Sequence, residues 1–223
     1  GTVCQMDGTP SHHVVDQALH IVEKLEHRAG KDASGTVGDG VGILLQVSDT
    51  FFTKACRQID IDYVPNGRTG IGMFFFPQNE LERNQAKKLF VTMARKEGCT
   101  FLGWRKVPVQ EEILGEPAKE CMPSIWQAFL KAPDTVKTRK DFDRLLYVLR
   151  REFEKSCPHT YVASLSCRTI VYKGMFLVDQ LRRFYLDLQS EDYQSAIAIV
   201  HSRFSTNTKP SWKRAHPNRM IAH

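Results

Sequence analysis

The residues with the clearest chemical potential lie in the stretch 201–223, HSRFSTNTKPSWKRAHPNRMIAH, directly after the apolar run AIAIV at 196–200. An apolar run that leads into a polar turn is how a strand delivers functional groups to the edge of a sheet. The planar guanidinium of Arg203 can make two parallel hydrogen bonds to a carboxylate. The stretch therefore predicts a turn that binds a substrate carboxylate. The alternative for Arg203 is a structural ion pair at the end of a strand.

A second candidate is the segment 29–42, AGKDASGTVGDGVG, whose five glycines lead into a strand-like run at 43–47. It contains neither GxxxxGK[ST] nor a GxGxxG after a strand, so it is not a phosphate-binding loop. A tight structural turn and a place beside the substrate both fit this pattern. Asp39 could carry charge into the site, or hold the glycine loop through hydrogen bonds from its side chain to the backbone.

Length and composition point to one globular domain spanning residues 1–223, with 42% hydrophobic and 25% charged residues. The net charge is +6, but the basic residues are scattered among 25 acidic ones and no nucleic-acid motif occurs. We therefore expect a solvated basic surface and no nucleic-acid partner.

Neither a membrane segment nor a metal site is expected. No apolar run approaches the ~20 residues that cross a bilayer, and the start GTVCQMDG lacks the features of a secretion signal, which favours the cytoplasm. Six cysteines lack the spacing of metal ligands, so we expect free and mostly buried thiols at Cys4, Cys56, Cys99, Cys121, Cys157 and Cys167.

Hydrophobic periodicity predicts an α+β fold, because helices near both ends flank strands without a regular strand-helix alternation. The expected helices are 11–26, 80–96, 141–154 and 178–188, with one short helix at 125–130 inside a surface excursion at 114–138. The expected strands are 43–47, 70–76, 101–109, 161–166, 169–173 and 196–201, and the pair 161–166 and 169–173 reads as a hairpin.

Five segments together resemble one family, the type 2 glutamine amidotransferase domain at the start of the glutamate synthase large subunit. In order along the chain, they are LEHRAGKDASGTVGDGVGILLQ (25–46), GIGMFFFPQ (70–78), LGWRKVPV (102–109), SLSCRTIVYKGMF (164–176) and HSRFSTNTKPSWKRAHPNR (201–219). The resemblance covers nearly the whole chain. It implies the N-terminal nucleophile hydrolase fold, a four-layer αββα sandwich with two antiparallel sheets between helical layers.

The resemblance also implies a reaction. In the family, the first residue of the mature chain is a cysteine that attacks the side-chain amide of L-glutamine, forms a thioester and releases ammonia, with its own α-amino group as base. The ammonia passes through a tunnel to a distant site, where FMN and an iron-sulfur cluster support glutamate synthesis from 2-oxoglutarate. The implied partners are the remainder of the large subunit and a small electron-donating subunit, and no cofactor is expected within 1–223.

Carried over residue by residue, the resemblance assigns the substrate-binding side of the site. Arg203 matches the clamp on the glutamine α-carboxylate, and Phe204, Thr206 and Asn207 match the turn that completes the pocket. His216 lies where the family has a histidine near the pocket wall. Turn capping for Thr206 and Asn207, and a structural hydrogen bond for His216, are the open alternatives.

The catalytic nucleophile is expected outside this sequence. The family begins Cys-Gly-x-Gly, and alignment places Gly1 on the second glycine, so the cysteine is expected three residues upstream and the oxyanion hole after His223. Cys4 has no α-amine to use and falls at an apolar strand position, so we expect a buried strand cysteine there. The segment 1–223 by itself is expected to be inactive, because losing oxyanion donors costs ~100- to 1,000-fold in rate. The alternatives are a non-catalytic domain that binds glutamine or a partner, and an amidotransferase domain that feeds another acceptor.

Overall fold

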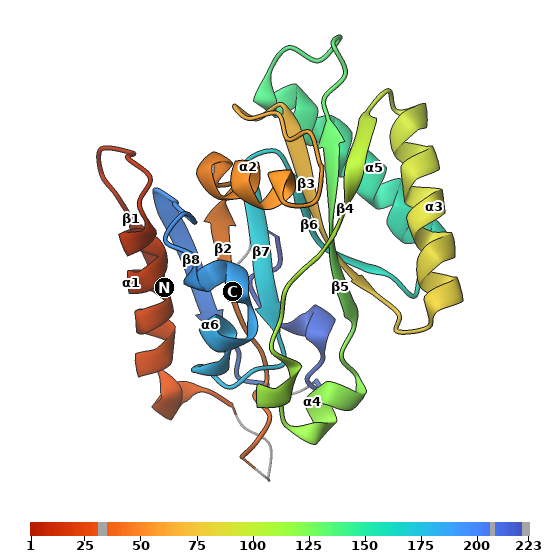
Figure 1. Ribbon diagram of the computed structural model, residues 1–223. Helices are drawn as coiled ribbons and strands as arrows, with labels where there is room; N and C mark the ends of the chain where they lie inside the picture. Colours follow the sequence, from red (N-terminus) through yellow and green to blue (C-terminus); the bar gives the residue numbers. More distant parts are fainter. Residues whose placement is uncertain (31–34, 206–207, 220–223) are drawn as a thin grey trace. The chain divides into compact units, whose positions relative to one another are not determined.

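The computed structural model describes residues 1–30, 35–205 and 208–219, and the chain divides into two compact units that alternate along the sequence (Figure 1). The first unit comprises Gly1–Ser48, Val107–Met122 and Val171–His223. The second comprises Asp49–Lys106 and Pro123–Ile170. Each contains strands of one four-stranded sheet, and together with the helices these two antiparallel sheets confirm the predicted α+β class.

The sheet of the first unit has the strand order β1-β8-β2-β7, with bounds Thr2–Cys4, Ile197–Ser202, Val41–Gln46 and Thr169–Gly174. β8 is antiparallel to both of its neighbours: Ile43 lies opposite Val200, and Thr2 opposite Ile199. The helix α1 (His12–Lys24) buries Val15, Leu19 and Val22, one face of a 3.6-residue repeat, and it packs against β8. The strand that precedes the polar turn is therefore held on both edges and from one face.

Shorter elements complete the first unit, and an aromatic cluster joins them. These elements are α4 (Glu116–Glu120), α6 (Gln180–Phe184) and the 3-10 helices Glu26–Arg28, Glu111–Ile113, Leu186–Gln189 and Trp212–Arg214. The ring centroids of Phe176 and Trp212 are 5.3 Å apart in an edge-on contact. The Trp212 indole also donates to the Ala118 carbonyl at 3.1 Å. This buried tryptophan anchors the segment that follows the polar turn.

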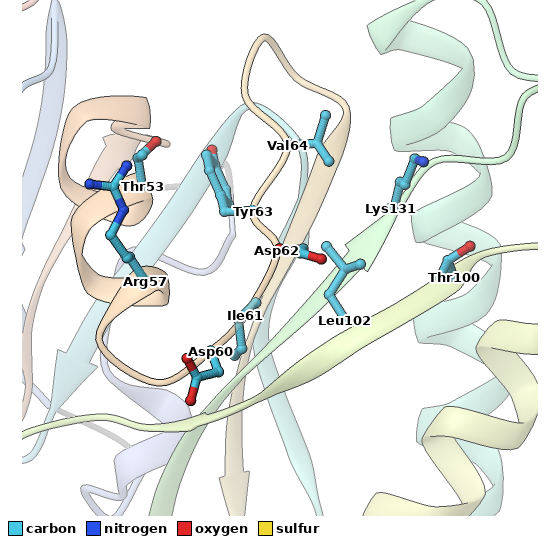
Figure 2. Close-up of a pocket in the computed structure, with 10 residues that line it drawn as sticks. All are labelled: Thr53, Arg57, Asp60, Ile61, Asp62, Tyr63, Val64, Thr100, Leu102 and Lys131. Atoms are coloured by element: carbon cyan, nitrogen blue, oxygen red, sulfur yellow. The ribbon is translucent and has the colours of Figure 1, made fainter.

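The sheet of the second unit has the order β4-β5-β3-β6, with bounds Thr100–Lys106, Ser124–Lys131, Thr69–Phe76 and Tyr161–Ser166. Its helices are α2 (Asp49–Arg57), α3 (Glu80–Lys96) and α5 (Arg139–Ser156). A pocket of about 780 Å³ lies within this unit, between α2, the loop 60–64 and the strands β4 and β5 (Figure 2). Its charged lining residues carry both signs, and none of the residues proposed for substrate binding lines it.

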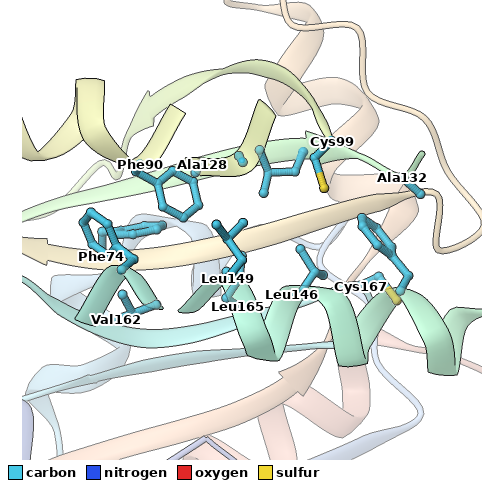
Figure 3. Close-up of a cluster of buried hydrophobic side chains, with 14 of the residues drawn as sticks. Phe74, Phe90, Cys99, Ala128, Ala132, Leu146, Leu149, Val162, Leu165 and Cys167 are labelled. Carbon is cyan, nitrogen blue, oxygen red and sulfur yellow. The ribbon is translucent and has the colours of Figure 1, made fainter. Parts of the chain in front are cut away.

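The core of the second unit is aromatic and aliphatic (Figure 3). The ring centroid of Phe74 on β3 lies 4.7 Å from that of Phe90 on α3 and 5.8 Å from that of Phe153 on α5. The side chains of Asn79 and Thr138 cap α3 and α5 by accepting backbone hydrogen bonds. A Cβ at Gly70 would lie 2.6 Å from a methyl of Leu146, so the absent side chain permits close packing of α5 on β3.

The helices predicted at 11–26, 80–96 and 141–154 are confirmed within two residues, but the prediction at 114–138 is wrong. Where a surface excursion with a short helix was expected, β5 runs between β4 and β3 with Ile125, Phe129 and Leu130 buried. A strand covered on both faces has no polar-apolar alternation, so its sequence pattern resembles that of a short buried helix. The helix α2 was not anticipated, and the strand β1 was expected only at Cys4, from the family resemblance.

The predicted hairpin at 161–173 is also wrong. The strands exist, but β6 pairs with β3 while β7 belongs to the other sheet. The Asp143 carboxylate holds the connection by accepting from the Ser166 hydroxyl at 2.9 Å and from the Cys167 amide at 2.8 Å, and it pairs with Arg168. Two short strands with a two-residue link are typical of a hairpin, and only tertiary pairing distinguishes a crossing between sheets. Within the residues that the structure describes, no helix is both long and apolar enough to span a membrane.

The packing of α5 predicts the effect of one core truncation. Leu146 is 0% exposed against β3, so Leu146→Ala should lower the free energy of unfolding by ~2–5 kcal/mol through lost burial and a residual cavity. Val148 lies on the same helix and is 45% exposed, so Val148→Ala should change it by less than ~0.5 kcal/mol. Urea unfolding measures both variants, and equal effects would contradict the assigned burial.

Candidate active site

The polar turn begins where β8 ends, and it lies beside the glycine-rich segment that precedes β2. In the pairing of these strands, Val41 lies opposite Ser202 and Gly42 opposite His201. The backbone amide of Arg203 then donates to the Gly40 carbonyl at 2.7 Å. The strand predicted at 196–201 is confirmed at Ile197–Ser202, and it delivers Arg203 beyond the last paired residue.

The guanidinium of Arg203 is half-buried and only partly hydrogen-bonded. Its Nη2 donates to the Thr208 hydroxyl, whereas Nη1 is buried and has no hydrogen-bond partner among the residues that the structure describes. Within the same residues Arg203 makes no ion pair with a carboxylate, which does not support a structural ion pair. A partly buried cation without an anion costs free energy that a bound carboxylate would offset.

Asp39 connects the glycine-rich segment to the turn. Its carboxylate accepts from the Ser205 amide at 2.5 Å, and its own amide donates to the Gly30 carbonyl at 3.1 Å. A Cβ at residue 30 would lie 1.9 Å from the Asp39 carboxylate, so this contact requires glycine there. Asp39 thus makes the expected side-chain to backbone bond, but its partner is the turn after β8 and not the glycine segment.

The segment after the turn lies directly on β2. A Cβ at Gly42 would lie 2.4 Å from the His216 carbonyl oxygen, and one at Gly40 would lie 2.8 Å from the Ala215 methyl. The glycines therefore admit a close approach by the chain itself. His216 is half-buried, and its ring lies 5.0 Å from that of His201 at the end of β8.

Lys173 is a buried cation that sequence reasoning missed. It is 0% exposed, and its ammonium donates to the Lys213 carbonyl at 3.0 Å, the Ala215 carbonyl at 2.8 Å and Asn218 Oδ1 at 2.7 Å. Burial, together with the nearby Arg219 cation, lowers the pKa of Lys173 to about 7. A lysine inside the apolar strand run TIVYKG was the available signal, because lysine is rarely fully buried without partners.

Of the predicted binding residues in the turn after Arg203, only Phe204 lies in the described part of the chain. Phe204 is 65% exposed, so its ring is available to a ligand. Thr206 and Asn207 lie outside the described residues. The structure thus brings Arg203, Asp39, His201 and His216 to one end of the β8-β2 pair.

Cys4 lies at the wrong end of β1 to act with Arg203, and the expectation that it is buried is wrong. It is exposed, and it pairs with Ile197, six residues before Arg203 on β8. At about 3.3 Å per residue of strand, this corresponds to ~20 Å along the ladder. The strand assignment is correct, but β1 is short and lies at the edge of its sheet, so the Cys4 side chain meets solvent.

The other thiols are free, but only Cys56, Cys99 and Cys167 are buried, so the expectation of mostly buried thiols holds for half of the six. Burial raises the pKa of Cys56 and Cys167 to about 12 and that of Cys99 to about 11, which disfavours the reactive thiolate. Across the described part of the chain, no group of three or more His, Cys, Asp or Glu side chains could hold a metal ion.

The contact between Asp39 and the turn predicts a local effect of mutation. In Asp39→Ala the Ser205 amide loses its acceptor, at a cost of ~1–3 kcal/mol, and hydrogen exchange of the turn should become faster. Asp39→Asn keeps an oxygen acceptor and should retain most of the protection. Hydrogen-deuterium exchange with urea unfolding measures both effects, and identical exchange at Ser205 in Asp39→Ala and the unaltered protein would contradict the contact.

Comparison with known proteins gives one consistent result. The family described as class-II glutamine amidotransferases matches residues 1–223. Similar proteins are the glutamate synthase (NADPH) large chain of Bacillus subtilis (42% identical), ferredoxin-dependent glutamate synthase 1 of Arabidopsis thaliana (40%) and the glutamate synthase (NADPH) large chain of Azospirillum brasilense (37%). Each match covers 100% of this chain but only 15%, 14% and 15% of the respective relative.

Proposed function

Because the chain belongs to the class-II glutamine amidotransferases, we propose that it is the glutaminase domain of a glutamate synthase, which hydrolyses L-glutamine to glutamate and ammonia. The observation that carries the proposal is the half-buried Arg203 after β8, whose Nη1 has no hydrogen-bond partner in the described part of the chain. The relatives that match over the whole of this chain are glutamate synthases, which favours a glutamate synthase over an amidotransferase that supplies ammonia to another acceptor.

The α-carboxylate of glutamine is the group that Arg203 binds in this proposal. A guanidinium makes two parallel charge-assisted hydrogen bonds to a carboxylate, and the buried Nη1 supplies a donor for one of them. Asp39 holds the turn through the Ser205 amide, so the guanidinium is presented from a fixed backbone. Phe204, Thr206, Asn207 and His216 complete the pocket around the substrate.

Strand register supports a nucleophile upstream of Gly1. β1 is antiparallel to β8, and the Gly1 backbone nitrogen donates to the Val200 carbonyl at 2.7 Å. A preceding segment that continued this ladder would place its residues, in order away from Gly1, opposite His201, Ser202 and Arg203. The third position is the one that the family resemblance gives to the catalytic cysteine. Directly opposed residues of antiparallel strands have Cα atoms ~4.5–5.5 Å apart, so the thiol and the carboxylate clamp would be neighbours.

The proposed reaction has two steps. The thiolate attacks the side-chain amide carbon of glutamine, a C–S bond forms, and the C–N bond breaks as ammonia leaves with a proton relayed by the α-amine. Water then cleaves the thioester to give glutamate. Oxyanion donors are proposed to follow His223, so residues 1–223 alone would bind the glutamine carboxylate without hydrolysing it.

The other parts of the proposal concern a larger protein. Ammonia is channelled to a distant synthase site for reductive amination of 2-oxoglutarate, with FMN and an iron-sulfur cluster held by other parts of the large subunit. The described residues of this chain do not fit such a cluster, because no metal-holding group of side chains occurs among them. A small electron-donating subunit is a proposed partner, and the cytoplasm is the proposed location.

The carboxylate clamp predicts a substrate-binding defect. In the full-length protein, Arg203→Lys should raise the KM for glutamine about tenfold or more, because a point charge cannot reproduce the fork, while kcat changes less. Arg183→Lys alters an exposed arginine of α6 in the same unit and should leave KM unchanged. Steady-state glutaminase assays measure both constants, and an unchanged KM in Arg203→Lys would refute the clamp.

Strand register also separates the two cysteine candidates. Cys4→Ala in the full-length protein should retain glutaminase activity within about twofold, because this thiol is exposed and lies at the far end of β1 from Arg203. Alanine in place of the cysteine proposed upstream of Gly1 should abolish the activity. Loss of activity in Cys4→Ala would overturn the register argument.

A further inference from the structure

We propose that Lys173 is a positioning residue for glutamine binding, whose ammonium group fixes the segment 213–218 and, through it, the turn that carries Arg203. This inference rests on the proposed function. Three oxygens of the segment surround the ammonium, at 3.0 Å from Lys213, 2.8 Å from Ala215 and 2.7 Å from Asn218. When it is protonated, lysine has three N–H donors, one for each of these oxygens, and no shorter polar side chain reaches as far with three donors.

The strand that carries Lys173 is itself held in place. The Lys173 carbonyl accepts from the buried Tyr185 hydroxyl at 2.8 Å, and a Cβ at Gly42 would lie 2.6 Å from the Lys173 Cβ. The backbone of Lys173 is therefore held in place within the sheet. The segment 213–218 has little regular structure beyond the 3-10 helix Trp212–Arg214, so the bonds from Lys173, together with the buried Trp212, determine its position.

Two contacts transmit this position to the substrate clamp. The methyl of Ala215 packs over Gly40, and the Gly40 carbonyl accepts from the Arg203 amide at 2.7 Å. On the next residue, the His216 ring lies 5.0 Å from His201, two residues before Arg203. A shift of the segment 213–218 away from β2 would therefore loosen the packing on Gly40, which holds the Arg203 backbone, and separate His216 from His201.

The first test is Lys173→Met in the full-length protein, since methionine is unbranched and similar in length but donates no hydrogen bond. We expect the KM for glutamine to rise about tenfold while kcat falls less than about threefold, the pattern of lost substrate binding. Lys24→Met, at an exposed lysine in the last turn of α1, is the matched control and should leave both constants unchanged. A fall in kcat with an unchanged KM would indicate only loss of folded protein and would overturn the proposal.

A second variant keeps the test informative if Lys173→Met folds poorly. Asn218→Ala removes one of the three acceptors and leaves both carbonyls, so KM should rise about threefold. In the double variant the two effects should be less than additive, because both substitutions disrupt one contact. Full additivity, or no effect of Asn218→Ala on KM, would contradict positioning by Lys173.

Hydrogen exchange separates failure of this inference from failure of the proposed function. In Lys173→Met and Asn218→Ala, amides of 208–216 should exchange at least about tenfold faster, while those of β3 keep their protection. Faster exchange in a protein that lacks glutaminase activity even when unaltered would support the positioning contact and refute the glutaminase proposal. Unchanged exchange would overturn the role of Lys173, whatever the activity.

Discussion

Close main-chain packing at the start of β2 is the constraint on which the candidate site depends. Neither Gly40 nor Gly42 has room for a side chain, because the carbonyl of His216 and the methyl of Ala215 occupy that space. The Gly40 carbonyl of the same backbone also accepts a hydrogen bond from the amide of Arg203, which follows the paired strand β8. The start of β2, the end of β8 and the segment 215–216 are far apart in sequence but pack together here, and the positions of the candidate site residues depend on this packing.

Three charged side chains in the first unit, Lys173, Asp39 and Arg203, differ in their hydrogen-bond partners. The Lys173 ammonium is fully buried but meets three oxygens, and the Asp39 carboxylate meets a backbone amide. Arg203 differs, because one of its terminal nitrogens is buried with no acceptor among the described residues. This buried donor of Arg203 is the one that the proposed function assigns to a substrate carboxylate.

Local patterns in the sequence sufficed where an element has one buried face. The apolar stripe of α5 and the run before Arg203 were sufficient to place both elements. Local patterns gave wrong predictions where tertiary contacts determine the structure. The strand β5 is buried on both faces and was predicted as a surface excursion with a short helix. The strands β6 and β7 belong to different sheets despite a two-residue link and were predicted as a hairpin. The proposed binding role of Arg203 rests on the family resemblance and on its position after β8. The contacts of Lys173 depend on a partner segment 40 to 45 residues away, which no local window contains.

The pairing of β1 with β8 sets the order in which the domain can be completed. Thr2 lies opposite Ile199, so the edge of this sheet closes a loop of nearly the whole chain. During synthesis on the ribosome, β1 must wait without its partner until β8 emerges, whereas the β3-β5 and β4-β5 pairs of the second unit are complete much earlier. An exposed, short edge strand tolerates this delay with little risk of pairing with another chain. The proposed carboxylate clamp at the end of β8 consequently forms after the pairs of the second unit, so on this proposal a chain that has not yet reached β8 would not bind the substrate.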